Sequence, residues 1–374
     1  MPIVQYKAGE RSCVIFVRVK DYWIARVLFR ACARAGHRLS SRSPFRGAAS
    51  RVRVPCFNYS FNLRAEMPTP DYSVELELGE PPPELLEYAR QHCGEDPNTR
   101  LQAIYELKEM IYERGECNPH RMDDEFLIRF LRARNFIPAR AHRLMVNYYQ
   151  FKEDNPELVD NIYPLDLRTL GDANVMAVPP YKDQQGHRLM FYRIGCWDPK
   201  SVPIEDLFKA TILALEIGLL EQRLQILGGV AIFDLDDIGT QHAWQITPSV
   251  AAKMVKLLVS CFPTKTYAIH VVNHSWLFDK IYNMFKPLLN SDMRSKIYFH
   301  GNDLTSLHKH INPDHLPERY GGIWPDYSYG IWLESLKKNY NVASEVLKIG
   351  YKFREHEIDP EVWRQLKEKG IQME

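Results

Sequence analysis

Residues 273–296 read NHSWLFDKIYNMFKPLLNSDMRSK and combine an amphipathic helical pattern with a built-in break. Their apolar side chains recur three and four residues apart, so they share one face of a helix; they are Leu277, Phe278, Ile281, Tyr282, Phe285, Leu288 and Leu289. Pro287 lacks an amide proton, and its ring crowds the carbonyl four residues earlier. The helix is therefore predicted to kink or end at this proline.

Short apolar strands are predicted on both sides of this segment, at residues 268–273 and 297–301. A strand, an aromatic-rich helix with a break and a second strand are what a hinged lid over an apolar cavity needs. An ordinary surface helix packed on a sheet has the same periodicity. The pattern alone leaves both interpretations open.

Length and composition are those of an ordinary globular protein. The 374 residues are 45% hydrophobic and 25% charged. No run approaches the roughly 20 apolar residues that span a bilayer, so we expect peripheral membrane contact at most. The seven cysteines are scattered without a CxxC pair, which favours reduced thiols and a cytoplasmic protein.

Residues 1–66 differ in charge from the rest of the chain. They hold 13 Lys and Arg against three acidic residues, a net charge of +10, although the whole chain carries only +1. We expect a disordered or spurious extension. An Arg-rich, acid-poor composition also fits a mitochondrial targeting segment, or an arm that binds nucleic acid or lipid. Residues 67–80 are interpreted as a linker.

The rest of the chain divides into three parts by its patterns. Helical spacing fills residues 81–155, strands alternate with helices over residues 156–330, and residues 331–374 form a helical tail. We expect a hairpin near residues 175–194, and one long helix over residues 204–224. An α/β fold with a small N-terminal all-helical domain follows from this order.

Motifs for catalysis or phosphate binding are missing from the sequence. It contains no GxGxxG, GxxxxGK[ST], GxSxG or HExxH. Two groups of potential metal ligands fit the capping of turns better than metal binding; they are His308, His310 and His315, and Asp234, Asp236 and Asp237. We therefore expect no catalytic residue, no cofactor and no metal site.

Eight segments resemble, in family order, the CRAL-TRIO family of lipid-transfer proteins, and most closely its tocopherol-transfer and retinaldehyde-binding branch. They are FLIRFLRARNF (126–136), YRIGCWDPK (192–200), AIFDLDDIG (231–239), QITPSVAAKM (245–254), CFPTKTYAIHVVN (261–273), FKPLL (285–289), KIYFHG (296–301) and HLPERYGG (315–322). This resemblance implies a three-layer α/β/α lipid-binding domain behind the helical domain. It also implies a movable lid over a buried hydrophobic ligand.

Matched to the family's pocket, a set of mostly apolar residues is implied to line the ligand: Tyr192, Phe208, Thr211, Leu215, Phe233, Leu257, Leu258, Phe262, Ile269, Phe278, Ile281, Tyr282 and Phe285. For each one singly, an ordinary core position is the alternative. The resemblance implies a monomeric, non-enzymatic carrier of a tocopherol-, retinoid- or other isoprenoid-like lipid. A phosphoinositide-binding scaffold or regulatory module in membrane trafficking is the alternative function.

A phosphoinositide site is also implied, with partial agreement between this chain and the branch. Lys265 and Lys296 match two of the four basic positions, while Tyr267 and Asp292 occupy the other two. Two nearby cations, Arg294 and Lys286, are candidate substitutes. We expect weak or differently selective binding of the headgroup, with a solvated charged surface as the alternative.

The lid is expected to open at a membrane surface and to expose its apolar face there. Hinge movement is predicted at residues 273–275 and around Pro287 and Ser291.

Overall fold

The computed structural model describes residues 3–8, 11–16 and 76–371. It divides the chain into two units, Met1–Met67 and Pro68–Glu374. In the first unit, β1 (Ile3–Ala8) and β2 (Arg11–Phe16) pair antiparallel, which the sequence did not predict. The other expectations for residues 1–66 lie outside the described residues. Within the described ranges, no helix is both long and apolar enough to cross a membrane.

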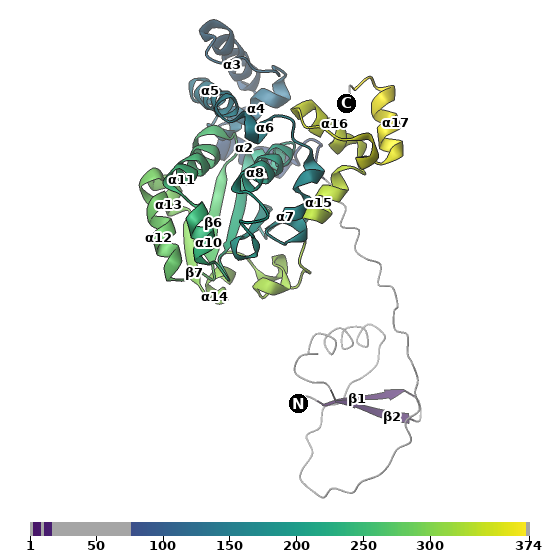
Figure 1. The fold of residues 1–374 in the computed structure, drawn as a ribbon. Helices are drawn as coiled ribbons and strands as arrows, with labels where there is room; N and C mark the ends of the chain where they lie inside the picture. Colours follow the sequence, from purple (N-terminus) through teal and green to yellow (C-terminus); the bar gives the residue numbers. More distant parts are fainter. Residues whose placement is uncertain (1–2, 9–10, 17–75, 372–374) are drawn as a thin grey trace, which may run out of the picture. The chain divides into compact units, whose positions relative to one another are not determined.

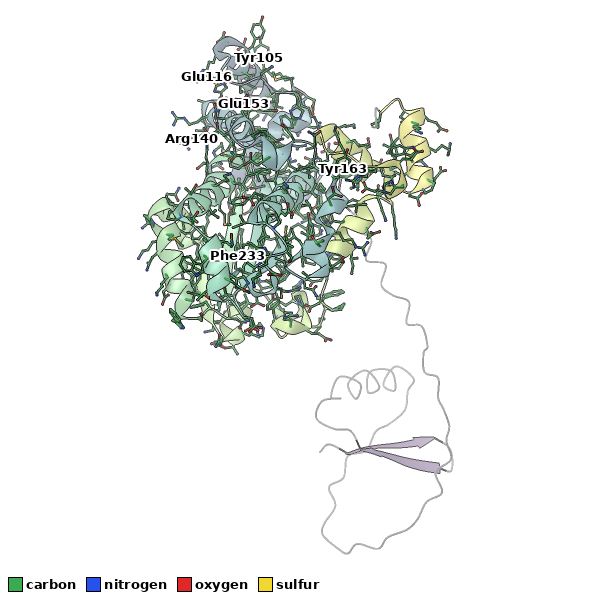
Figure 2. The ribbon with its side chains drawn as sticks, viewed as in Figure 1. Tyr105, Glu116, Arg140, Glu153, Tyr163 and Phe233 are labelled. Carbon is green, nitrogen blue, oxygen red and sulfur yellow. The ribbon has the colours of Figure 1, made fainter. Side chains whose placement is uncertain are left out.

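Four helices fill the region with helical spacing: α2 (Pro83–Cys93), α3 (Arg100–Arg114), α4 (Asp124–Ala133) and α5 (Pro138–Asp154). The Asp123 side chain begins α4 by accepting a hydrogen bond from the Phe126 amide. Gly94 ends α2 at a φ of 68°, a conformation that glycine adopts without strain. Figure 2 shows Tyr105, Glu116, Arg140 and Glu153 on this helical module and Phe233 in the sheet domain.

A five-stranded mixed sheet follows, in the order β3-β4-β5-β6-β7 (Figure 1). The strands are β3 (Met176–Ala177), β4 (Arg188–Arg193), β5 (Gly229–Asp234), β6 (Thr266–Val272) and β7 (Ile297–Gly301). β3 and β4 form the predicted antiparallel hairpin, and the remaining neighbours are parallel. Because the parallel strands follow in spatial order, right-handed connections place their helices on one face.

The connecting helices are α8 (Ile204–Gly218), α9 (Gln222–Leu227), α10 (Thr240–Gln245), α11 (Pro248–Val255), α12 (Trp276–Phe285) and α13 (Ser291–Ser295). One long helix over residues 204–224 was predicted, and the structure shows two. α8 ends at Gly218, a residue of poor helix propensity. Glu221, whose buried carboxylate is held by Arg188, precedes α9 in an extended conformation.

The opposite face of the sheet is closed by residues after β7. Leu189, Phe191, Val230, Ile232, Ala268 and Val272 project from the strands into one buried cluster, and Leu307, Ile311, Leu316 and Tyr320 cover them. Leu307 lies on α14 (Leu304–His308). The strands alternate between the two faces with a period of two residues, as an extended chain must.

The tail packs on the sheet domain through α15 (Tyr329–Leu336), α16 (Tyr340–Ile349) and α17 (Pro360–Glu368). Its side chains join α8 and α7 (Arg168–Asp172) in a large buried cluster that includes Trp332 and Trp363. The sequence pattern predicts two helices here, at residues 331–338 and 360–369, and it does not predict α16. Asn339 caps α16 by accepting from two amides, and Gly350 ends it at a φ of 110°.

Candidate ligand-binding cavity

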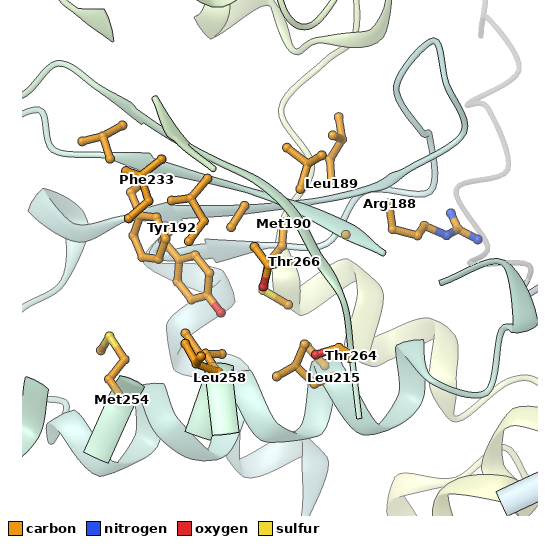
Figure 3. A pocket seen from close by; sticks show the side chains of 18 of the residues that line it. Arg188, Leu189, Met190, Tyr192, Leu215, Phe233, Met254, Leu258, Thr264 and Thr266 are labelled. Carbon is orange, nitrogen blue, oxygen red and sulfur yellow. The ribbon is translucent and has the colours of Figure 1, made fainter. Parts of the chain in front are cut away.

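A cavity of about 280 Å³ lies between the sheet and its helix layer, and nearly all of its lining is apolar. Its floor is formed by alternate strand residues, which are Met190, Tyr192, Ala231, Phe233, Ile269, Val271, Ile297 and Phe299. Figure 3 shows Tyr192 and Phe233 from the strands facing Leu215, Met254 and Leu258 from the helices. Such a cavity suits an apolar ligand, because water gains few hydrogen bonds there.

Helix α12 covers the cavity with its aromatic side. Phe278 and Tyr282 stack at 5.7 Å between ring centroids, and both rings contact Phe299 of β7. Ile281 and Phe285 of the same face also line the cavity. The pattern that fitted a lid or a plain surface helix thus belongs to a helix lying over a cavity.

The chain enters α12 through a hydrogen-bonded turn. Asn273 has a φ of 54°, its amide donates to the Gly301 carbonyl at 2.6 Å, and its side-chain Nδ2 donates to Asp234 Oδ1 at 2.8 Å. The Tyr320 hydroxyl donates to the other Asp234 oxygen at 3.0 Å. Asp234 therefore accepts hydrogen bonds at the end of the sheet, which is the capping interpretation of this carboxylate.

The histidines near residue 310 divide between two structural settings. Rings of His308 and His315 lie within hydrogen-bonding distance of the Tyr320 and Lys182 carbonyls, at 2.8 and 2.7 Å. His310 packs beside His270 instead. Among the residues that the structure describes, no three His, Cys, Asp or Glu side chains are arranged to hold a metal ion.

Hydroxyl groups interrupt the apolar lining at Tyr192, Thr264 and Thr266. Tyr192 Oη lies 3.0 Å from Thr211 Oγ1, and the Tyr192 ring stacks on Phe233 at 4.8 Å. Burial raises the pKa of Tyr192, so its hydroxyl keeps its proton. It offers a ligand one neutral hydrogen-bonding group.

The amino-terminal ends of the strands supply charged residues that largely satisfy each other. Arg188 Nε donates to Glu221 Oε2 at 2.7 Å, and a second guanidinium nitrogen donates to Oε1. Arg188 Nη1 donates to the Pro180 carbonyl at 2.7 Å. Lys265 also borders the cavity, but its Nζ lies 3.0 Å from Cys93 Sγ of α2. Because Arg188 and Glu221 neutralise each other, neither is free to pair with a charged group of a ligand.

Nine of the thirteen predicted ligand residues lie on the cavity wall: Tyr192, Leu215, Phe233, Leu258, Ile269, Phe278, Ile281, Tyr282 and Phe285. The wall residues Met190, Ala231 and Val271 were missed, although each lies two positions from a predicted strand residue. Period-two alternation from Tyr192, Phe233 and Ile269 was the signal that could have found them.

The other four predicted residues do not line the cavity. Phe208, Leu257 and Phe262 pack into the core that α8 and the π-helix after α11 (Lys256–Cys261) share with the helical module. Thr211 lies behind Tyr192. Phe208 has the same helical phase as Leu215, but it lies about 10 Å earlier along the axis. A shared face therefore did not mean a shared cavity.

The basic residues near the lid have unequal surroundings. Lys286 is exposed, and Arg294 Nε donates to the Leu289 carbonyl at 2.9 Å. Lys296 Nζ lies 2.9 Å from Asp292, so part of its charge is neutralised, as the sequence indicated. Lys265 and Lys296 lie near the starts of neighbouring strands, since the Ile269 amide donates to the Lys296 carbonyl.

Comparison with known proteins assigns both halves of this architecture. Residues 83–147 match the CRAL/TRIO N-terminal domain, and residues 172–322 match the CRAL/TRIO domain. Clavesin-1 of Xenopus laevis is 33% identical over 273 residues, which are 72% of this chain and 82% of the relative. The chain belongs to the CRAL/TRIO family. Membership of this lipid-binding family agrees with the prediction, while the tocopherol or retinaldehyde branch stays a prediction.

Two further relatives show how far the similarity extends. Clavesin-2 of Homo sapiens is 31% identical over 284 residues, or 75% of this CRAL/TRIO chain and 86% of that protein. A crystal structure of Sfh5 aligns with 61% of this chain and 88% of its own, at 17% identity and a TM-score of 0.38. That score is too low to support an argument about the fold.

Proposed function

We propose that this CRAL/TRIO protein is a non-enzymatic carrier that holds one hydrophobic small molecule under α12 and transfers it at phosphoinositide-containing membranes. The cavity itself is the observation that carries the proposal, because an apolar space of about 280 Å³ beneath a helix is not needed for folding. Burying a hydrocarbon ligand there stabilises the complex by roughly 0.8 kcal/mol per CH₂.

The ligand class follows from the lining. The Arg188–Glu221 pair is satisfied internally, and the neutral polar groups on the cavity wall are the hydroxyls of Tyr192, Thr264 and Thr266. A tocopherol-, retinoid- or other isoprenoid-like molecule with at most a neutral polar end fits this distribution. A ligand with a strongly charged group would have to break the buried ion pair, which is costly.

Membrane docking is proposed for the outer side of the lid. Trp276 at the start of α12 is 70% exposed, and Lys280 Nζ lies 5.1 Å from its ring centroid. Trp244 on the neighbouring α10 is 80% exposed. Tryptophan favours the membrane interface, where its ring is apolar and its N–H meets water. We infer that α12 swings on residues 273–275 and on the break near Pro287 and Ser291.

Headgroup binding is proposed for Lys286, Arg294 and Lys296, with Lys265 at the next strand. Each cation near an anionic surface contributes about 1 kcal/mol, and the pairing of Lys296 with Asp292 reduces that sum. We expect binding that is weaker than four free cations would give.

Lid function is tested by transfer of a fluorescent isoprenoid between vesicles. Phe278→Asp combined with Phe285→Asp places two charges on the cavity side of α12 and should slow transfer at least tenfold. Asn283→Asp, on the exposed side of the same helix, is the matched control and should transfer like the wild type. Unchanged transfer by a folded double variant would exclude the lid from the mechanism.

A further inference from the structure

A short strap, residues 76–80, closes the cavity where strands β4 and β5 begin. Leu76 is part of the cavity lining, together with Val178, Arg188 and Glu221. The parallel register places Arg188 opposite Gly229, which is opposite Thr266, so this end of the cavity lies at the amino-terminal edge of the sheet. The lid instead contacts Phe299 of the far edge strand, β7. The cavity thus has two different closures.

The strap is fixed by polar contacts of Glu77, the residue after Leu76, through both its backbone amide and its carboxylate. The Glu77 amide donates to Glu221 Oε1 at 2.9 Å. The Glu77 carboxylate accepts from Arg223 Nε at 2.7 Å and from Lys182. Partial burial alone would raise the pKa of Glu77, but these two cations lower it to about 2, so the contacts persist at neutral pH.

The Glu221 carboxylate both holds the strap and belongs to the cavity wall. Glu221 accepts from the Glu77 amide and also from the Arg188 guanidinium. Leu76 itself packs against the large core cluster, so its backbone and its side chain are both anchored. An apolar side chain therefore stands in front of buried, mutually paired charges at the end of an apolar space.

We propose that Leu76 is the end wall of the cavity and sets the maximum length of the hydrophobic ligand. A longer chain would have to displace Leu76 or press on the Arg188–Glu221 pair, which a hydrocarbon cannot solvate. This inference rests on the proposed carrier function. The strap precedes residue 83, where the match to the family's N-terminal domain begins.

Competition by straight-chain alkan-1-ols of 12 to 22 carbons against a bound neutral fluorescent probe, N-phenyl-1-naphthylamine, tests the proposal on the full chain. Each methylene that enters the cavity should lower Kd about fourfold until the chain reaches the end wall. Leu76→Ala should move the longest favourable alcohol upward by two or more carbons. Leu76→Trp should move it downward.

The control is Leu78→Ala, because Leu78 lies on the same strap, is 37% exposed and is not part of the cavity wall. It should keep the wild-type length limit. The same limit in wild type, Leu76→Ala and Leu76→Trp would overturn the end-wall assignment while leaving the carrier function intact. A wild-type protein that binds no alcohol of any length would contradict the carrier function itself, and with it this inference.

Discussion

The two faces of the central sheet carry similar stacked aromatic pairs in different surroundings. On the packed face, Phe191 stacks on Tyr320 at 5.2 Å with an interplanar angle of 8°. On the cavity face, Tyr192 stacks on Phe233 at 4.8 Å, again at 8°. The first pair is sealed by the chain after β7, whereas the second borders an open space. Packing on one face stabilises the fold, and incomplete packing on the other leaves room for a ligand.

The largest difference between the faces is expected for aromatic truncation. Phe191→Ala should cost about 3 to 5 kcal/mol of unfolding free energy, because it opens a void in a dense cluster. Phe233→Ala should cost less than half of that, because its ring already borders empty space. Urea unfolding of the two variants measures the difference. Equal losses would mean that the cavity face is as tightly packed as the other.

Replacing a small side chain by a large one should also cost more stability on the packed face than on the cavity face. Ala177→Trp, on the packed face opposite Phe191, should destabilise the protein by about 3 kcal/mol through overpacking. Ala231→Trp places the same indole in the cavity, so it should cost little stability but should reduce ligand binding sharply. Thermal unfolding and binding of a fluorescent lipid check both halves. If Ala231→Trp binds lipid like the wild type, the cavity is not the ligand site.

Acid should weaken the packed face through two buried imidazoles. His270 Nδ1 and His300 Nε2 lie 2.9 Å apart. Burial, followed by neighbouring imidazoles, lowers the pKa of His270 to about 3 and that of His300 to about 4, whereas both titrate near 6.5 when unfolded. Below pH 6.5 the unfolded state therefore binds more protons than the folded state. As the pH falls from 6.5 towards these lowered pKa values, the free energy of unfolding decreases by about 1.4 kcal/mol per pH unit for each ring.

Urea unfolding between pH 7.5 and 4.5 measures this slope. His270→Phe should make stability less dependent on pH across that range. His356→Gln changes an exposed histidine of the tail and should leave the pH dependence as it is. A wild-type stability that stays constant from pH 7 to 5 would contradict the buried, neutral state of this pair.

The smallest effect is expected at the lid's basic residues. Lys265→Ala should weaken binding to phosphoinositide-containing vesicles by about 1 kcal/mol, or roughly fivefold. Lys296→Ala should weaken it by less, because Asp292 already neutralises part of the Lys296 charge. Lys309→Ala removes the same charge beside α14, on the packed side of the sheet, and should have no effect. Vesicle sedimentation with and without phosphoinositide decides the matter. Equal binding by all four proteins to both vesicle types would remove this site.

Local patterns predicted the amphipathic helix α12 and the hairpin, and the family resemblance supplied the order of the segments. They could not predict which side of an apolar helix meets a cavity. Leu257 and Leu258 are adjacent and equally apolar, yet Leu257 is buried beside the helical module and Leu258 lies on the cavity wall. The break after Gly218 likewise depends on Arg188, 33 residues from Glu221 in the sequence. Such outcomes are set by tertiary contacts that periodicity does not contain.

The position of Leu76 on the cavity wall also depends on a tertiary contact. Leu76 was assigned to a linker, although residues 74–78, VELEL, alternate between apolar and acidic side chains. Its place at the cavity end comes from the hydrogen bond between the Glu77 amide and Glu221, which are 144 residues apart. The sequence offered no local signal for that contact.

The central claim, that the cavity holds a hydrophobic small molecule, is tested most directly by extracting purified wild-type protein with organic solvent and identifying the extract by mass spectrometry. The Ala231→Trp variant, prepared in parallel, is the control for lipid bound elsewhere. The account predicts a neutral isoprenoid-like species close to one per wild-type chain, and strong depletion in the variant. Equal amounts from both proteins, or none from the wild type, would contradict it.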